Sequence, residues 1–305
     1  MIEVRNVTKK FDKFVALNNI SCKIDEGSIF GLVGSNGAGK STLLRIICDV
    51  FNSDSGEVLI DGEAVRENYE IKKRMVYVPD EPFFLAGANL KRMAALYANM
   101  YDGFDMDYFN RLVELFALDP KKKISGFSKG MKRQAAIILG LSVRPRYLFL
   151  DETFDGLDPV MKNLVKRILC SEITEREFTA VLTSHSLREL DEVCDQLAFI
   201  HEGGLVYEKD AASIKTSLTK VQLAFNYEYD ESLFGGLTVV KLIKSGSVAT
   251  LIVRDERERV EEIINSLNPI ICEYLPLKLE EIFACEMEAL GYKFDLDILM
   301  EGKNE

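Results

Sequence analysis

The sequence predicts an α/β domain with a mostly parallel core sheet, followed by a small α+β domain. Short apolar runs such as SIFGLV, MVYVP and RYLFLDE alternate with stretches of helical period such as STLLRIICDVF and PVMKNLVKRILC. This alternation is typical of parallel strands joined by helices. Near residue 215 the pattern changes to closely spaced short strands, so we expect one domain at 1–215 and a second at 216–305.

The first domain is expected to contain a helical segment between its strands. The first thirty residues hold short β-like runs, IEVRNV and FVALNNISCKI. A buried strand, MVYVP, is stopped by Pro79 and Pro82. From about 89 to 142 the pattern is helical, which predicts a helical insert at about 85–145. The continuous apolar run RYLFLDE then ends in two acids, as a central parallel strand does.

The second domain has its own alternation of strands and helices. KVQLAFNYEY, LTVVKLI, SVATLIV and IICEYL are typical of strands, and a charged helix is expected from about 255 to 265. A final helix is expected at LEEIFACEMEAL. The 216–305 segment is therefore predicted to be a small α+β accessory domain.

The composition narrows the class of protein. The 305 residues include 38 basic and 49 acidic ones, for a net charge of −11, which argues against a general nucleic-acid binder. Six scattered cysteines lack metal-ligand spacing, and most stand beside apolar residues, so we expect buried free thiols in a reducing cytosol. The sequence shows neither a signal-peptide pattern nor an apolar run near the ~20 residues that span a bilayer. A membrane role would therefore need a partner chain.

A glycine-rich loop is the first candidate site. GSNGAGKST matches G-x-x-x-x-G-K-[ST] and lies between the apolar run SIFGLV and the helical pattern TLLRII, as this phosphate-binding motif requires. The glycines let backbone N–H groups surround phosphates. Lys40 is expected at the β- and γ-phosphates of ATP and Ser41 at Mg²⁺. The predicted loop residues are Gly34, Ser35, Asn36, Gly37, Ala38, Gly39, Lys40, Ser41 and Thr42.

Two acids at the end of RYLFLDE form the second candidate site. Asp151 is expected to belong to the Mg²⁺ shell. Glu152, the next residue, is placed to accept a proton from an attacking water. A strand that ends in Asp-Glu can also be an ordinary solvated strand end. Its position downstream of a phosphate loop favours the catalytic interpretation.

The order of these and later motifs resembles the ATP-binding subunit of an ABC (ATP-binding-cassette) transporter, over residues 1 to about 215. After GSNGAGKST come the helical insert, FSKGM at 127–131, LFLDE, DGLD at 155–158, and TSHS. The resemblance implies a P-loop NTPase cassette with a mixed core sheet, an N-terminal antiparallel β subdomain and a helical insert. It also implies binding and hydrolysis of Mg·ATP.

The segment FSKGM corresponds to the family's signature sequence, commonly LSGGQ, and matches it only at Ser128 and Gly130. Ser128 can donate its hydroxyl and cap the following helix, and Gly130 leaves room for a phosphate. In the family this segment faces ATP held by a second subunit. Lys129 is then expected near that nucleotide, whereas Lys132, Arg133 and the lysines at 121–123 are expected to be solvated.

Two further residues match family motifs. Asp158 in DGLD corresponds to the family's D-loop. The alternative is a simple turn before a helix whose first residue is Pro159. Asp158 is expected to cap that helix in either case. His185 corresponds to the switch histidine, which contacts the γ-phosphate and helps position water.

Two more residues stand at positions that the resemblance links to adenine recognition and to a glutamine of the family. Phe11 stands where the resemblance implies an adenine-stacking ring, with Phe14 as a competitor and core packing as the alternative. Asp80 stands where the family has a glutamine that reaches Mg²⁺. Its carboxylate suits Mg²⁺ but adds negative charge beside a triphosphate, and a polar turn is the alternative.

The function implied by the resemblance is that of an ATPase motor. Two copies, or this chain and a paralogue, are expected to close head to tail and to drive an integral-membrane permease on another chain, from the inner face of the membrane. The surface near 80–101 is the expected docking site, and LEEIF resembles the end of bacterial exporter-type subunits. The alternatives are a soluble ABC ATPase acting on ribosomes or DNA, and a nucleotide sensor without turnover.

Overall fold

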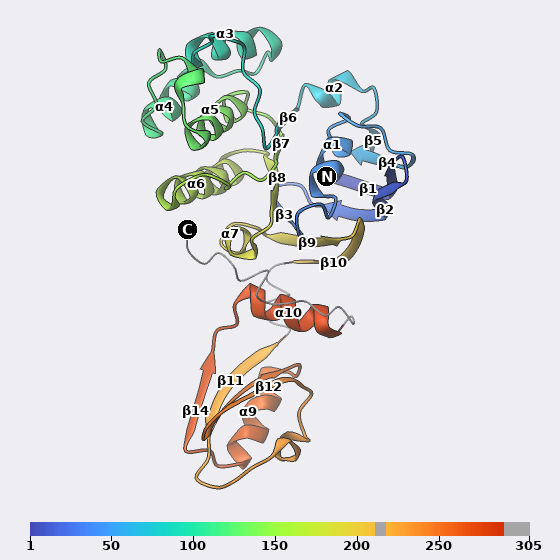
Figure 1. The fold of residues 1–305 in the computed structure, drawn as a ribbon, viewed down its shortest axis with the longest axis vertical. Coiled ribbons are helices and arrows are strands. Elements are labelled where there is room, and N and C mark those ends of the chain that lie inside the picture. Colours follow the sequence, from blue (N-terminus) through green and yellow to red (C-terminus); the bar gives the residue numbers. More distant parts are fainter. Residues whose placement is uncertain (211–217, 290–305) are drawn as a thin grey trace. The chain divides into compact units, whose positions relative to one another are not determined.

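The computed structural model describes residues 1–210 and 218–289, and the chain forms two compact units, Met1–Glu208 and Lys209–Glu305 (Figure 1). The predicted boundary between residues 215 and 216 lies outside the described residues. Among the residues that the structure describes, no helix has both the length and the hydrophobicity needed to cross a membrane. All six cysteines are free thiols, but the expected burial is wrong for Cys170 and Cys272, whose side chains are exposed although each follows an apolar residue in the sequence.

The core of the first unit is a six-stranded sheet in the order β10-β9-β3-β8-β7-β6. β3 pairs in parallel with β8 and β9, and β7 pairs in parallel with β6 and β8. Every residue of β3, β7 and β8 is buried, as expected of parallel strands covered on both faces. The strands are β3 (Ile29–Val33), β6 (Met75–Val78), β7 (Tyr147–Leu150), β8 (Thr179–Ser184), β9 (Gln196–His201) and β10 (Gly204–Asp210).

An antiparallel sheet in the order β2-β1-β4-β5 flanks this core, and β3 of the core lies between its second and third strands in the chain. Its buried residues share one hydrophobic core with the first helix and the main sheet, for example Leu17 with Leu44 and Phe149. The antiparallel subdomain implied by the resemblance is therefore confirmed. The strands are β1 (Ile2–Phe11), β2 (Phe14–Ile24), β4 (Ser55–Ile60) and β5 (Glu63–Ala64).

The predicted helical insert corresponds to three helices that pack together beside the sheet (Figure 1). Its last helix, α5, is buried on nearly all sides from Arg133 to Ser142. The remaining helices of this unit lie against the main sheet or next to it. The helices are α1 (Lys40–Ile47), α2 (Tyr69–Lys72), α3 (Leu90–Met100), α4 (Met106–Leu115), the 3₁₀ turn η1 (Ile124–Gly126), α5 (Lys129–Ser142), α6 (Pro159–Glu175) and α7 (Leu187–Asp191).

The second unit is a four-stranded antiparallel sheet in the order β12-β13-β11-β14. Val260 and Ile264 of the helix α9 join the apolar face of the sheet in one core. Lys220 of β11 pairs with Glu281 of the last helix at 2.6 Å. The elements are β11 (Thr219–Ala224), η2 (Glu231–Phe234), β12 (Val239–Ser245), β13 (Val248–Val253), α9 (Arg257–Ser266), β14 (Ile271–Leu275) and α10 (Leu279–Ala289).

Candidate active site

The loop between β3 and α1 follows its tight path because two of its residues have no Cβ. A Cβ on Gly34 would lie 2.3 Å from the carbonyl oxygen of Ile200. One on Gly39, where φ is +113°, would lie 2.7 Å from the carbonyl oxygen of Ala16. The loop then enters α1 at Lys40, so the unpaired N–H groups of a helix start are available to an anion.

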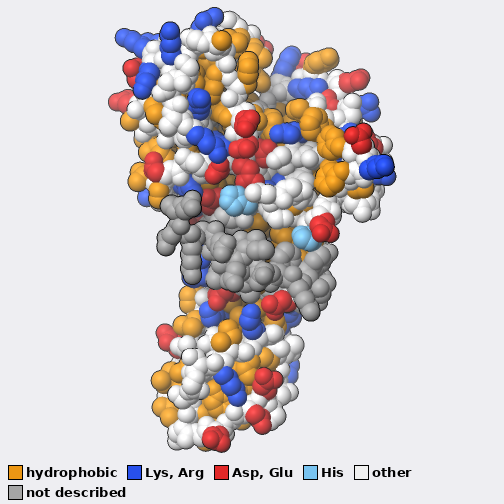
Figure 2. Space-filling view, viewed as in Figure 1, with side chains coloured by type: hydrophobic (Ala, Val, Ile, Leu, Met, Phe, Trp, Pro, Cys, Tyr) orange, Lys and Arg blue, Asp and Glu red, His pale blue; other side chains and the backbone are white. Residues whose placement is uncertain are grey.

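A cavity of about 570 Å³ opens at this loop. Figure 2 shows acidic side chains gathered beside a histidine on one face of the Met1–Glu208 unit. The cavity brings together most of the residues predicted for nucleotide binding and hydrolysis. Its lining residues are Phe11, Phe14, Ala16, Asn36, Gly37, Gly39, Lys40, Ser41, Thr42, Asp80, Glu152, Asp155 and His185.

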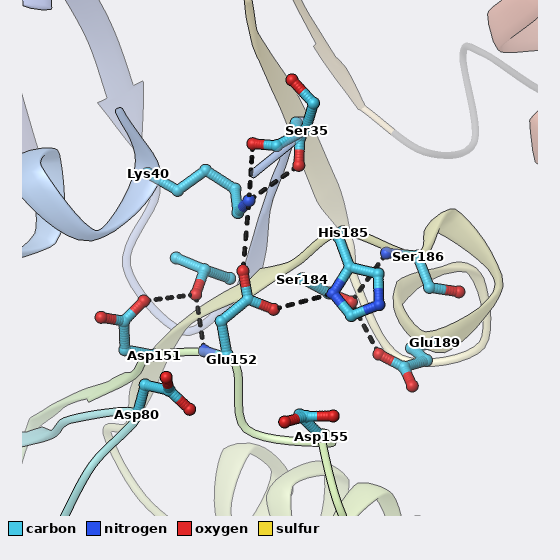
Figure 3. A network of polar contacts seen from close by, with 12 residues as sticks. Ser35, Lys40, Asp80, Asp151, Glu152, Asp155, Ser184, His185, Ser186 and Glu189 are labelled. Carbon is cyan, nitrogen blue, oxygen red and sulfur yellow. Dashed lines mark hydrogen bonds and ion pairs between the residues drawn. The ribbon is translucent and has the colours of Figure 1, made fainter. Parts of the chain in front are cut away.

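Lys40 is the cation of this cavity and is only 5% exposed. Its Nζ donates to the carbonyl oxygens of Gly34 at 2.7 Å and Ser35 at 3.2 Å, and it lies 3.1 Å from Glu152 Oε1 (Figure 3). A buried ammonium is costly unless an anion and hydrogen bonds compensate it. The same position suits a phosphate group as the compensating anion.

Asp151 leaves β7 directly beneath the loop and is buried. Its Oδ1 accepts hydrogen bonds from Ser41 Oγ at 2.9 Å and Thr183 Oγ1 at 2.7 Å, and its Oδ2 accepts one from the Tyr77 hydroxyl at 3.0 Å. Burial, and after it the charge of Asp151, raise the pKa of the Tyr77 phenol, so that Tyr77 stays a donor. The structure thus brings two of the three predicted Mg²⁺ ligands, Ser41 and Asp151, into contact.

Ser41 and Asp151 suit a magnesium ion that is also bound by phosphate oxygens of a substrate. Mg²⁺ prefers oxygen ligands and commonly uses one or two protein groups together with substrate phosphates. Within residues 1–210 and 218–289, no three His, Cys, Asp or Glu side chains form a metal-binding group. Ser41 and Asp151 therefore supply the number of ligands expected of an ion held mainly by phosphates.

Glu152 lies between Lys40 and His185. Its Oε2 is 3.2 Å from His185 Nδ1, a distance at which a protonated Nδ1 donates a hydrogen bond. The loop that carries His185 is fixed by Ser184, whose Oγ donates to Glu189 Oε2 at 2.6 Å (Figure 3). The cavity therefore contains a carboxylate that is oriented by a cation on one side and an imidazole on the other.

Arg133 departs from what the sequence predicts, whereas Asp80 lines the cavity and its role at Mg²⁺ stays a prediction. Arg133 was expected to be solvated, and this prediction is wrong, because its side chain is 1% exposed. Its Nη1 donates to the carbonyl oxygens of Asp151 at 3.0 Å and Glu152 at 2.9 Å, and its Nη2 pairs with Asp80 Oδ1. The helical period contained the signal, since Arg133 precedes the fully buried Ile137 by four residues and shares its face.

Tyr77 and Thr183 are also absent from the sequence-based site. Each is a hydroxyl-bearing residue next to the last position of a largely buried strand, MVYV and TAVLTS. A buried hydroxyl needs a hydrogen-bonding partner, and here the partner is Asp151 for both residues. A polar residue within a buried strand was therefore the sequence signal that could have placed both residues in the site.

The start of α5 is capped as predicted. Ser128 Oγ accepts a hydrogen bond from a backbone N–H three residues on, at 3.2 Å. A Cβ on Gly130 would lie 2.5 Å from the carbonyl oxygen of Gly156, so glycine lets α5 approach the DGLD loop. Asp158 caps α6 ahead of Pro159, again as predicted. Ser128, Gly130 and Asp158 do not line the cavity.

Phe11 and Phe14 both line the cavity and both are exposed. Phe11, the last residue of β1, also makes an edge-to-face contact with Phe51, with ring centroids 5.7 Å apart. Phe11 is thus the better fixed of the two rings, and Phe14 extends further into solvent. The structure places both candidates for adenine stacking at the same site.

Lys129 pairs within its own chain, with Nζ 2.6 Å from Asp155 Oδ2. The hydrogen bond from Lys129 lowers the pKa of Asp155 below its usual 3.8. The contribution of a carboxylate with a lowered pKa is present above pH 3.8 and is lost as the pH falls through the lowered value.

We therefore expect Lys129→Met to destabilise the protein by about 0.2–1 kcal/mol at neutral pH, the usual value for an exposed pair. The difference from wild type should shrink below about pH 3.8. Urea unfolding of both proteins across this pH range measures it. A difference that does not change with pH would contradict the ion pair as its cause.

Comparison with known proteins agrees with this geometry. Residues 17–155 match the family model described as ABC transporter. The ABC transporter ATP-binding protein YtrB of Bacillus subtilis (strain 168) is 30% identical over 283 residues, which cover 93% of this chain and 97% of YtrB. The bacitracin transport ATP-binding protein BcrA of Bacillus licheniformis is 30% identical over 211 residues, covering 68% of this chain and 69% of BcrA.

The fold is shared with solved structures. One is a dimeric structure of the ATP-binding cassette MJ0796 in a post-hydrolysis state, bound to ADP and Pi. Its TM-score is 0.63 at 21% identity, and the match covers 69% of this chain and 99% of that one. The predicted cassette fold is therefore confirmed. The chain belongs to the ATP-binding subunits of ABC transporters, a family of ATP hydrolases.

Proposed function

We propose that this chain is the motor of a transporter, in which two copies, or this chain and a paralogue, close head to tail around two Mg·ATP and drive a separate membrane permease. The observation that carries the proposal is the position of Glu152, whose carboxylate lies 3.1 Å from Lys40 Nζ and 3.2 Å from His185 Nδ1 in the cavity. Measurement of ATP hydrolysis by Glu152→Gln tests it.

The phosphate loop is proposed to hold the triphosphate, with its backbone N–H groups and Lys40 on the phosphate oxygens. Phe11 is proposed to stack on adenine, for ~1–3 kcal/mol by analogy with stacking of bases on aromatic side chains. Ser41 and Asp151 would hold Mg²⁺, which, when bound, offsets the negative charge that develops on the phosphates during transfer.

Hydrolysis needs a base and a fixed water. In the proposed reaction a water oxygen bonds to the γ-phosphorus while the bond to the bridging oxygen breaks, and ADP leaves with that oxygen. Glu152 takes the proton of the water, and His185 orients the reacting groups. A phosphate on Lys40 would replace Glu152 as the partner of the ammonium, and the carboxylate would then be available for this proton.

A second subunit is proposed to complete the site. Ser128 and Gly130 lie at the exposed start of α5 and Asp158 at the start of α6, all outside the cavity of their own chain. A nucleotide can meet these groups only if another subunit presents them. The dimeric state of MJ0796, named above, supports this arrangement for the fold.

Docking of the permease is proposed at the loop that follows Asp80. A groove of about 310 Å³ is formed there by Pro82–Gly87 together with Ile124, Ser125 and Lys132. Phe83 is 79% exposed at this groove, and an exposed aromatic side chain beside an apolar groove suits a protein partner.

Docking would place the chain on the cytoplasmic face of the membrane. The transport named for BcrA and for the lantibiotic protein SrtF of Streptococcus pyogenes supports a transport role.

We expect Phe83→Asp to weaken permease docking by about 10–100-fold, since burial of a Phe side chain contributes ~1.5–3 kcal/mol. The share of full-length chain recovered with native membranes should fall, while hydrolysis by the isolated chain stays within about twofold of wild type. Tyr69→Asp is the matched control, because Tyr69 is similarly exposed, at 74%, but lies outside the groove. Equal membrane recovery for both variants would place the docking surface elsewhere.

A further inference from the structure

Arg133 is a buried cation that joins two loops of the active site. One guanidinium contacts three oxygen atoms: a carboxylate oxygen of Asp80 and the carbonyl oxygens of Asp151 and Glu152. Arginine suits this arrangement because it presents five N–H donors in a rigid plane. The side chain comes from α5, so a third element, the last helix of the insert, is tied to both loops.

Asp80 supplies the charge that makes this burial possible. A guanidinium that is 1% exposed needs an anion, and Asp80 is its one ion-pair partner among the described residues. The Asp80 side chain is itself 43% exposed and lines the nucleotide cavity. Loss of the Asp80 charge would therefore leave the more deeply buried member of the pair uncompensated, which is the costly case.

Glu152 needs such a support because its backbone is strained. Its φ is +45°, in the left-handed region that residues other than glycine seldom adopt. Strained backbone of this kind persists only where surrounding groups hold it. The Glu152 N–H donates to Thr183 Oγ1 at 2.7 Å, and its carbonyl oxygen accepts from Arg133 Nη1 at 2.9 Å.

We propose that Arg133 is a positioning residue for hydrolysis. It fixes the main chain of Glu152 and thereby the direction of its carboxylate, and it links this position to Asp80 at the start of the loop that forms the docking groove. Movement of that loop would act on Glu152 through one guanidinium. The proposal rests on the proposed role of Glu152 as the base. The link that Arg133 makes between Asp80 and the Glu152 main chain does not depend on the transported cargo.

The experiment compares purified full-length Arg133→Met, Arg133→Lys, Asp80→Asn and the double variant Asp80→Asn/Arg133→Met with wild type. Arg66→Met, an exposed arginine, is the matched control. Three quantities are measured for each: kcat for Mg·ATP, the Kd of a fluorescent ATP analogue, and Tm. Glu152→Gln is included as the reference for loss of the base.

Arg133→Met should lower kcat by about 10-fold or more because Glu152 loses its orientation, with the analogue Kd within about twofold because the phosphate loop and Lys40 are unchanged. Arg133→Lys should recover Tm more than kcat, since one ammonium cannot reproduce a planar fork. Asp80→Asn should have a lower Tm than the double variant, in which no uncompensated cation is buried.

Several outcomes overturn the proposal. A kcat of Arg133→Met within twofold of wild type would exclude a positioning role. Wild-type kcat in Arg133→Lys would also exclude it, because a positive charge alone would then be sufficient. If Arg133→Met does not fold, Arg133→Lys decides by the same kcat and Kd. Full activity of Glu152→Gln would instead refute the proposed base, so the two failures are distinguishable.

Discussion

Glu152→Gln is expected to lower kcat for ATP by ~10²–10⁴-fold, which is about 3–5 kcal/mol of barrier. The amide keeps the size of the side chain and its contact with His185 but cannot accept a proton from water. Binding of ATP should be unchanged or tighter, because the Lys40 ammonium loses the carboxylate 3.1 Å away that competes with a phosphate. Single-turnover ADP formation and analogue binding measure the two quantities separately.

Glu114→Gln is the matched control for this variant. Glu114 is exposed on α4 and does not line the cavity. Its substitution should leave both kcat and Kd within about twofold of wild type. Hydrolysis by Glu152→Gln at the wild-type rate would show that another group takes the proton.

Lys40→Met is expected to weaken ATP binding by roughly 10–100-fold, the equivalent of a charge-assisted hydrogen bond of ~1.5–3 kcal/mol. Methionine fills much of the same buried volume, so the loss reports the charge rather than a cavity. The variant also leaves Glu152 without its cation in the nucleotide-free protein. Titration of a fluorescent ATP analogue measures the effect. Lys91→Met, which changes an exposed lysine of α3, is the control and should bind the analogue with the wild-type Kd. Equal Kd values for the Lys40 and Lys91 variants would exclude Lys40 as a phosphate ligand.

The same variant tests the head-to-tail dimer when it is mixed with Ser128→Asp. Aspartate keeps the helix cap but places a negative charge where a phosphate of the partner's ATP is proposed to lie. Each variant alone should be nearly inactive. An equal mixture should recover about a quarter of the wild-type rate, because half of the dimers are mixed and each mixed dimer has one complete site. Absence of recovery would contradict pairing of two copies of this chain through Ser128.

Much of the first unit could be predicted because its signals are local. GSNGAGKST between an apolar strand and a helix specifies a phosphate loop, since backbone freedom and the start of a helix are consequences of neighbouring residues. The caps at Ser128 and Asp158 are local in the same way, and both are confirmed. Apolar runs also predicted the buried strands, and the parallel pairing followed from the helices between them.

The surroundings of Asp151 and Glu152 could not be predicted because they involve distant parts of the chain. Asp80 and Arg133 are 53 residues apart, and Asp151 meets Tyr77 across 74 residues. Arg133 follows several lysines, so its charge suggested solvent exposure. Only the packing of α5 against the sheet removes its side chain from water.

The sequence by itself determined the fold of the cassette, the phosphate loop, the two acids that follow β7 and the family to which the chain belongs. These depend on residue type, order and helical or strand period, which the chain carries locally. The tertiary structure alone decided that Asp80 is paired with Arg133, that Lys129 is paired with Asp155 in its own chain, and that Glu152 lies between Lys40 and His185. Ion pairs depend on burial and on the distance between charged atoms, and both arise only when separate elements pack together.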